Sequence, residues 1–179
     1  MTPEVTAQYR LPRQFLLPIL PSPRHLQADE ILADADGEPV FDEKQYLLSC
    51  SLPEATLRSS YPSLYKYLEV GIERRIDERY LCRHRDPWYS QEDRPASPFL
   101  CRYMGRSGTR SGKPFRFILN HSKATAANVY LLLYPKPRLA QLLATNIELF
   151  QPVWKALSTI TPHAMLGERR VYGGGIAQA

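Results

Sequence analysis

The chain has 179 residues, 44% of them apolar and 23% charged, so it can bury a core and is not wholly disordered. No apolar run approaches the roughly 20 residues of a membrane-spanning helix, which argues against an integral membrane protein. The formal net charge of +5 favours an anionic partner.

The first 44 residues are expected to be irregular. The stretch from Leu11 to Pro23 holds four prolines among large apolar residues, too many prolines for a helix and too many apolar residues for a solvated linker. Asp34 to Pro39 then carries turn-forming residues. We therefore predict a proline-rich, extended arm over residues 1–44, packed on the core, and a main domain over residues 45–179, the two forming a single globular unit.

Short elements follow the arm. Residues 46–51 read as a buried strand, and a helical turn is expected to open at Pro53 and Glu54, because proline is tolerated at the start of a helix. A second helix is expected to start at Pro62 and to stop near Gly71. Residues 73–82 are predicted to continue as a charged helix.

The second half combines strands and helices. Strands are predicted over residues 99–104, 115–119 and 129–134, the first two joined by a flexible basic loop over residues 105–113. An amphipathic helix is predicted over residues 139–150, and another helix from Pro152. Strands in the middle with helices on both flanks indicate the α+β class.

Positive charge is concentrated between Arg79 and Lys123, which we call the basic segment. It contains ten Lys/Arg and three Asp/Glu, a charge of +7, whereas the rest of the chain sums to −2. Arginine can grip a phosphate or a guanine edge with its planar fork, Trp88 and Tyr89 can stack on a base, and Asn120 can read adenine. The alternative is a solvated charged face, with Trp88 and the phenylalanines in the core. The candidate contacts with nucleic acid are Arg83, Arg85, Trp88, Tyr89, Arg94, Arg102, Arg106, Arg110, Lys113, Arg116, Asn120 and Lys123.

No catalytic, cofactor-binding or metal-binding residue is predicted. G-x-S-x-G and H-E-x-x-H patterns are absent, and residues 108–114 are one residue short of a phosphate-binding loop. Cys82 and His84, with Cys101, do not have the paired spacing of a zinc site. Three widely spaced cysteines and the lack of a signal-peptide pattern predict an intracellular, cytoplasmic protein.

An ordered series of short segments resembles the C-terminal specificity region, or target-recognition domain, of TaqI-like adenine-N6 DNA methyltransferases of restriction–modification systems. The segments are Pro87-Trp88-Tyr89, Pro98-Phe99-Leu100, Tyr103-Met104-Gly105-Arg106 and Phe115-Arg116-Phe117-Ile118-Leu119-Asn120, with further agreement at residues 11–36, 80–85, 128–131 and 170–175. The resemblance covers most of the chain. It implies a central antiparallel, partly open β arrangement flanked by a helical bundle.

The catalytic parts of such enzymes are missing from this sequence. It has no Pro-Pro pair, hence no Asn-Pro-Pro-Tyr/Phe motif, and no glycine-rich loop between a strand and a helix, hence no Rossmann methyltransferase domain. We therefore expect the chain to be inactive alone, with S-adenosylmethionine bound by a catalytic domain that is not in this chain.

Three hypotheses for function follow. The first is a domain that reads double-stranded DNA for the methyltransferase catalytic domain, with a restriction endonuclease as a possible further partner. The second is a scaffold that docks the methyltransferase or the endonuclease through residues 11–20 and the C-terminal helices, without reading bases. The third, an autonomous enzyme, has the least support.

Overall fold

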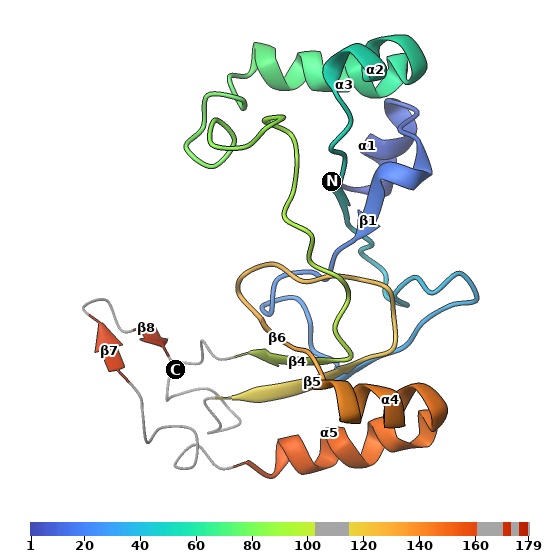
Figure 1. Ribbon diagram of the computed structural model, residues 1–179, viewed down its shortest axis with the longest axis vertical. Coiled ribbons are helices and arrows are strands. Elements are labelled where there is room, and N and C mark those ends of the chain that lie inside the picture. The colour runs from blue at the N-terminus through green and yellow to red at the C-terminus, as the bar shows by residue number, and fades with distance from the viewer. Residues whose placement is uncertain (103–114, 161–169, 173–175, 179) are drawn as a thin grey trace. The chain divides into compact units, whose positions relative to one another are not determined.

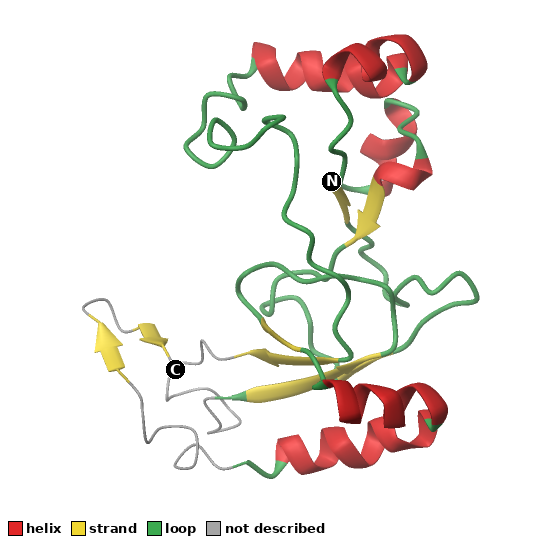
Figure 2. Cartoon of the chain, in the orientation of Figure 1, coloured by secondary structure: helices red, strands yellow, loops and turns green. Residues whose placement is uncertain are grey.

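The computed structural model describes residues 1–102, 115–160, 170–172 and 176–178 (Figures 1 and 2). The chain divides into two compact units, each described by itself below. Unit 1 contains residues 1–19 and 41–95, and unit 2 contains residues 20–40 and 96–179. The predicted arm therefore contributes to both units, and its boundary at residue 44 stays a prediction. No helix within the described ranges is long and apolar enough to span a bilayer.

Unit 1 is mainly helical, with one two-stranded antiparallel sheet. The sheet pairs β1 with β3, which confirms the strand predicted at Tyr46, and the predicted helix starts near Pro53 and Pro62 are confirmed as well. The expectation of an irregular N-terminus was wrong for the first residues, which form a short helix with Pro3 in its first turn. The elements are α1 (Pro3–Gln8), the 3₁₀ turn η1 (Arg13–Phe15), β1 (Leu16–Pro18), β3 (Tyr46–Leu48), α2 (Glu54–Ser60) and α3 (Pro62–Glu73).

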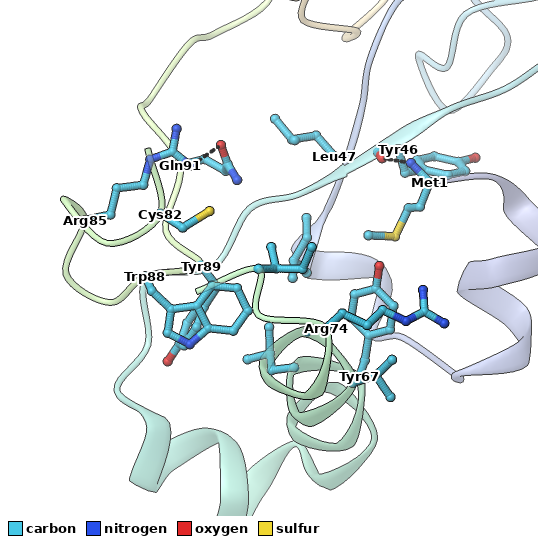
Figure 3. Close-up of a pocket in the computed structure, with 15 residues that line it drawn as sticks. Met1, Tyr46, Leu47, Tyr67, Arg74, Cys82, Arg85, Trp88, Tyr89 and Gln91 are labelled. Carbon is cyan, nitrogen blue, oxygen red and sulfur yellow. Dashed lines mark hydrogen bonds between the residues drawn. The ribbon is translucent and has the colours of Figure 1, made fainter. Parts of the chain in front are cut away.

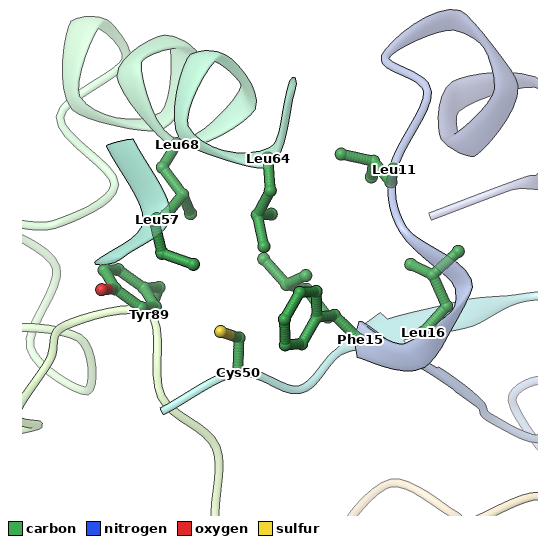
Figure 4. Packing of buried hydrophobic residues seen from close by; sticks show 9 residues of the cluster. Leu11, Phe15, Leu16, Cys50, Leu57, Leu64, Leu68 and Tyr89 are labelled. Carbon is green, nitrogen blue, oxygen red and sulfur yellow. The ribbon is translucent and has the colours of Figure 1, made fainter. Parts of the chain in front are cut away.

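The core of unit 1 lies between these helices and the small sheet. Leu57 of α2 and Leu64 of α3 are fully buried, and Phe15 and Cys50 join them from the sheet side (Figure 4). Tyr89 is part of the same cluster and is only 5% exposed. The later, irregular part of unit 1 is thus tied to the helices by an aromatic ring.

Helix α3 ends later than the sequence suggested. Gly71 lies within the helix, and the chain leaves it through Arg75, whose φ of 55° is left-handed. The Ile76 N–H donates to the Gly71 carbonyl at 2.9 Å, which closes the helix end. The helix predicted over residues 73–82 is therefore wrong, because the chain turns there instead.

Unit 2 is built on a four-stranded sheet. Its strand order is β2-β5-β4-β6, with β5, β4 and β6 antiparallel and β2 parallel to β5. The three strands predicted in this half are confirmed, with β5 shifted by one residue and β6 shorter than predicted. Residues 103–104 of the first predicted strand and the predicted basic loop over residues 105–113 lie outside the described residues. The strands are β2 (Glu30–Ile31), β4 (Phe99–Arg102), β5 (Arg116–Asn120) and β6 (Leu131–Leu133).

Two helices cover this sheet with apolar side chains. Phe99, Leu119 and Leu143 form the buried centre, and the Trp154 indole N–H donates to the Phe117 carbonyl at 3.1 Å. The single helix predicted over residues 139–150 was wrong, because Asn146 leaves the helical region and exposes Ile147. The elements are α4 (Pro137–Thr145), η2 (Ile147–Leu149) and α5 (Phe150–Ser158), followed by the antiparallel pair β7 (Arg170–Tyr172) and β8 (Ile176–Gln178). Small open sheets with helices confirm the predicted α+β class.

A buried side-chain amide fixes the end of β5. Asn120 is 4% exposed, and its two amide hydrogens go to the carbonyls of Ser97 (3.2 Å) and Ala124 (3.1 Å). Its amide oxygen accepts from the N–H and the hydroxyl of Ser122. One side chain therefore holds together the chain before β4 and the chain after β5.

The left-handed residue at the end of α3 predicts a stabilising substitution. Glycine has no Cβ penalty in this conformation, so Arg75→Gly should raise the free energy of unfolding by about 0.5–1 kcal/mol. The exposed Arg75–Glu78 ion pair that is lost contributes little. Urea unfolding measures the change, and Glu78→Gln serves as the control for the ion pair. A loss of stability in Arg75→Gly beyond that of Glu78→Gln would contradict this account.

The amide network predicts a large effect at Asn120. Asn120→Ala leaves two buried carbonyls and the Ser122 hydroxyl without their partner, so the free energy of unfolding should fall by about 2–4 kcal/mol. Ser122→Ala, which removes one hydroxyl, should cost about half as much or less. Urea unfolding of the two variants checks the order, and equal stability of Asn120→Ala and the parent would show that the network is not needed.

Candidate nucleic-acid interface

The predicted arginines of the basic segment in unit 1 differ in how many of their charges are paired with other side chains. Arg83 is exposed and lies over the Tyr80 ring, 5.6 Å from its centroid. The half-buried Arg85 donates to the Gln91 side chain at 3.1 Å, and Arg94 forms an ion pair with Glu92. Of these three predicted arginines, Arg83 thus presents its charge most openly, beside a tyrosine that is 69% exposed.

The two aromatic candidates serve the fold of unit 1. Tyr89 is buried and its hydroxyl donates to the Leu52 carbonyl at 2.6 Å, so its ring has no face for a base. Burial also raises the pKa of this hydroxyl above its ordinary value. Trp88 is half-buried and packs over Gly71, where an added Cβ would lie 2.8 Å from the indole Cη2. Gly71 therefore makes room for the indole, a role that the helix pattern did not indicate.

A cavity adjoins Trp88 within unit 1 (Figure 3). Its volume is about 440 Å³, and α3, β3 and the turns after α3 line it. Tyr67 and Arg74 belong to this lining and were not among the predicted residues. The sequence analysis missed Arg74 because it lay in a predicted helix in the acidic part of the chain.

In unit 2, two arginines lie side by side on adjacent strands of the sheet. Arg102 of β4 pairs in register with Arg116 of β5, which places both side chains on one face. The Arg116 guanidinium is held by the Asp29 carboxylate and by the carbonyls of Leu26 (2.8 Å) and Gln27. Within the described residues, the half-buried Arg102 has no such partner. Among the described residues, the charge of Arg102 at this end of the β4–β5 ladder is therefore not neutralised.

The remaining predicted residues have structural partners or fall outside the description. Asn120 uses both amide hydrogens inside unit 2, and the exposed Lys123 donates from Nζ to the Asp36 carbonyl at 2.9 Å. Lys123 also packs along Gly37, whose φ is +79°. Arg106, Arg110 and Lys113 lie outside the described residues. For all twelve residues, contact with nucleic acid stays a prediction.

Burial raises the pKa of two titratable groups in unit 2, the Tyr130 hydroxyl and the Cys101 thiol. Burial raises the pKa of the Tyr130 hydroxyl to about 12, although Arg116 and Arg102 act in the opposite direction, and this hydroxyl donates to the Pro21 carbonyl at 2.8 Å. Burial likewise raises the pKa of the Cys101 thiol to about 11. The protonated thiol is a poor nucleophile and a poor metal ligand. No group of three or more metal-ligating side chains gathers in the described ranges.

Comparison with known proteins gives a family over the full length. Residues 1–179 match the family described as the C-terminal domain of the type II methyltransferase M.Eco57I. The type II methyltransferase M.XamI of Xanthomonas campestris pv. amaranthicola is 28% identical over 102 residues, which cover 57% of this chain and 16% of that protein. The type II methyltransferase M.AccI of Acinetobacter calcoaceticus is 25% identical over 125 residues, which cover 69% of this chain and 21% of that protein.

The matched part of each relative is therefore about a fifth of its length or less. No solved structure matches the chain. The resemblance to the C-terminal region of restriction–modification methyltransferases is confirmed by the full-length family match. The chain belongs to the family of the M.Eco57I methyltransferase C-terminal domain.

Proposed function

We propose that this chain is the DNA-recognition domain of an S-adenosylmethionine-dependent, adenine-N6-specific DNA methyltransferase of a restriction–modification system. The observation that carries the proposal is the Arg102–Arg116 pair, in which the Arg102 guanidinium of β4 has no ion-pair partner among the described residues. The pair lies within the basic segment of a chain that belongs to a methyltransferase C-terminal domain family. An anionic partner can neutralise such a charge without breaking an interaction that stabilises the fold.

A division of labour explains why such a domain is needed. An enzyme that methylates adenine N6 must take the base out of the duplex, because that atom cannot be reached inside the stack. The surrounding duplex must be held in register meanwhile, and its sequence must be read from the grooves. A separate cationic domain can supply both kinds of contact.

The predicted residues fall into two groups, according to whether other residues of the chain already bind their side chains. Arg83 and Arg102 keep charge that the described structure does not neutralise, and they are the first candidates for phosphate contacts. Arg106, Arg110 and Lys113 fall between β4 and β5 in the sequence, outside the described residues, and they stay candidates for phosphate contacts on the basis of their charge. Arg116, Asn120 and Tyr89 position the strands and loops that carry these contacts.

S-adenosylmethionine is assigned to a catalytic domain rather than to this chain. Doubly wound methyltransferase domains hold cofactors at a glycine-rich turn between a parallel strand and a helix. The one parallel pairing in the described residues, β2 with β5, has no such turn and helix after either strand, so the residues do not fit the cofactor. The catalytic domain is accordingly a proposed partner of this chain, and the cytoplasm is its proposed location.

An apolar groove in unit 2 favours scaffolding as a second candidate function. It has a volume of about 490 Å³ and lies between the end of β6 and the helices α4 and α5. Leu142 lines it and is 47% exposed. An exposed apolar groove of this kind suits docking of another protein segment.

Neutralising Arg102 should weaken DNA binding. Arg102→Gln should lower the affinity for a short duplex about fivefold at low salt and reduce the slope of log K against log[salt] by about one, as expected for one lost phosphate contact. Arg138→Gln, an exposed arginine of α4 in the same unit, is the matched control. Fluorescence anisotropy of labelled duplex measures both variants, and an equal effect of the two would contradict a specific role for Arg102.

Charge reversal discriminates DNA reading from scaffolding. Changing Arg106, Arg110 and Lys113 together to glutamate should abolish duplex binding if the chain reads DNA, because three phosphate contacts become repulsive. Under the scaffold alternative the DNA affinity of the enzyme reconstituted with the catalytic domain should hardly change.

A further inference from the structure

The cavity of unit 1 has the size and lining of a small-molecule site. Its volume of about 440 Å³ falls in the range of roughly 300–1,000 Å³ that is usual for ligand pockets. Leucine, valine and isoleucine side chains form one part of the lining, and four aromatic rings form another. Such a lining favours a flat, largely apolar group.

The aromatic rings stand on two sides of the cavity (Figure 3). Trp88 forms one side, and the buried ring of Tyr89 supports it, with the two ring centroids 5.5 Å apart in an edge-to-face arrangement. Tyr46 and Tyr67 belong to the other side, and the hydroxyl of Tyr67 has no hydrogen bond to another described residue. A planar ring that entered would meet aromatic surface on both sides and a free hydroxyl.

The charged side chains of the lining are both positive. Arg85 is held by Gln91 at 3.1 Å, whereas Arg74 is exposed and forms no ion pair within the described part of the chain. Figure 3 places Arg74 beside Tyr67 at the cavity. The described lining contains no aspartate or glutamate. Charge complementarity therefore favours an anion that carries a flat ring.

We propose that this cavity binds one unstacked nucleotide of DNA, with the base between the aromatic sides and the phosphate on Arg74. The inference rests on the proposed function in DNA recognition and adds to it a pocket that receives a displaced nucleotide. Stacking on aromatic side chains stabilises unpaired bases of any sequence, so the pocket recognises an unstacked nucleotide rather than a particular base.

The test compares two short duplexes of the same sequence, one fully paired and one with a single bulged nucleotide. The bulged duplex should bind about tenfold more tightly, because one base gains stacking in the protein. Trp154→Phe leaves Trp88 as the single indole of the chain, and its fluorescence should be quenched by the bulged duplex more than by the paired one.

Two neighbouring arginines provide matched variants. Arg74→Gln should remove most of the preference for the bulged duplex, since the phosphate loses its partner. Arg75→Gln is the control, because Arg75 is also exposed, forms an ion pair with Glu78 and is not part of the lining. Urea unfolding should show both variants folded, and loss of the preference in both alike would overturn the role of Arg74.

The outcomes separate this inference from the proposed function. Salt-sensitive binding of both duplexes with equal affinity would overturn the nucleotide pocket and leave DNA recognition standing. Absence of any duplex binding would overturn DNA recognition, and the pocket would then be tested with deoxyadenosine monophosphate alone. Quenching of Trp88 by this mononucleotide, reduced in Arg74→Gln, would support the pocket, and its absence would overturn it.

Discussion

The buried amide of Asn120 is the interaction on which the sheet of unit 2 depends. It satisfies the carbonyl of Ser97, just before β4, and that of Ala124, just after β5. These two carbonyls are buried, and leaving either one without a donor would cost more than an ordinary hydrogen bond contributes. The amide thereby secures the ends of β4 and β5, whose register sets Arg102 opposite Arg116.

Unit 1 has a comparable constraint at Gly71. The absence of a side chain there lets the Trp88 indole lie on α3, and Tyr89 next to it reaches the core and the Leu52 carbonyl. The irregular chain after α3 is thus anchored by two successive aromatic residues. The cavity lies beside this anchor, and α3 and the turns after it line the cavity. In both units, some of the side chains predicted to contact nucleic acid are instead used to stabilise the fold. Other charged side chains in the same unit keep a charge that no described residue neutralises.

Strands and helix starts could be predicted from the sequence because they depend on local chemistry. Leu100, Ile118 and Leu132 lie in short apolar runs that read as strands, and Pro62 marks the first turn of α3. The end of α3 could not be predicted, since glycine at position 71 serves a packing contact with a residue 17 positions later.

The candidate site was less predictable than the fold. Residue type and local charge correctly indicated that the arginines form a cationic group. They could not show that Arg116 binds a carbonyl far earlier in the chain, or that Asn120 binds a carbonyl just before β4. Arg74 was missed for a different reason: α3 itself places it on the same face as Tyr67, seven residues earlier, but the cavity that both line also depends on turns later in the chain. Tertiary partners, which a single sequence does not display, decide which charges remain free.

The salt dependence of duplex binding tests the central claim most directly. Anisotropy titrations of the whole chain with a labelled duplex at several salt concentrations give the slope of log K against log[salt]. A domain that holds DNA through several arginines should give a slope of about −3 to −5, since each phosphate contact contributes about −0.9. A slope near zero, or no binding at low salt, would contradict the account of this chain as the part of a methyltransferase that reads DNA.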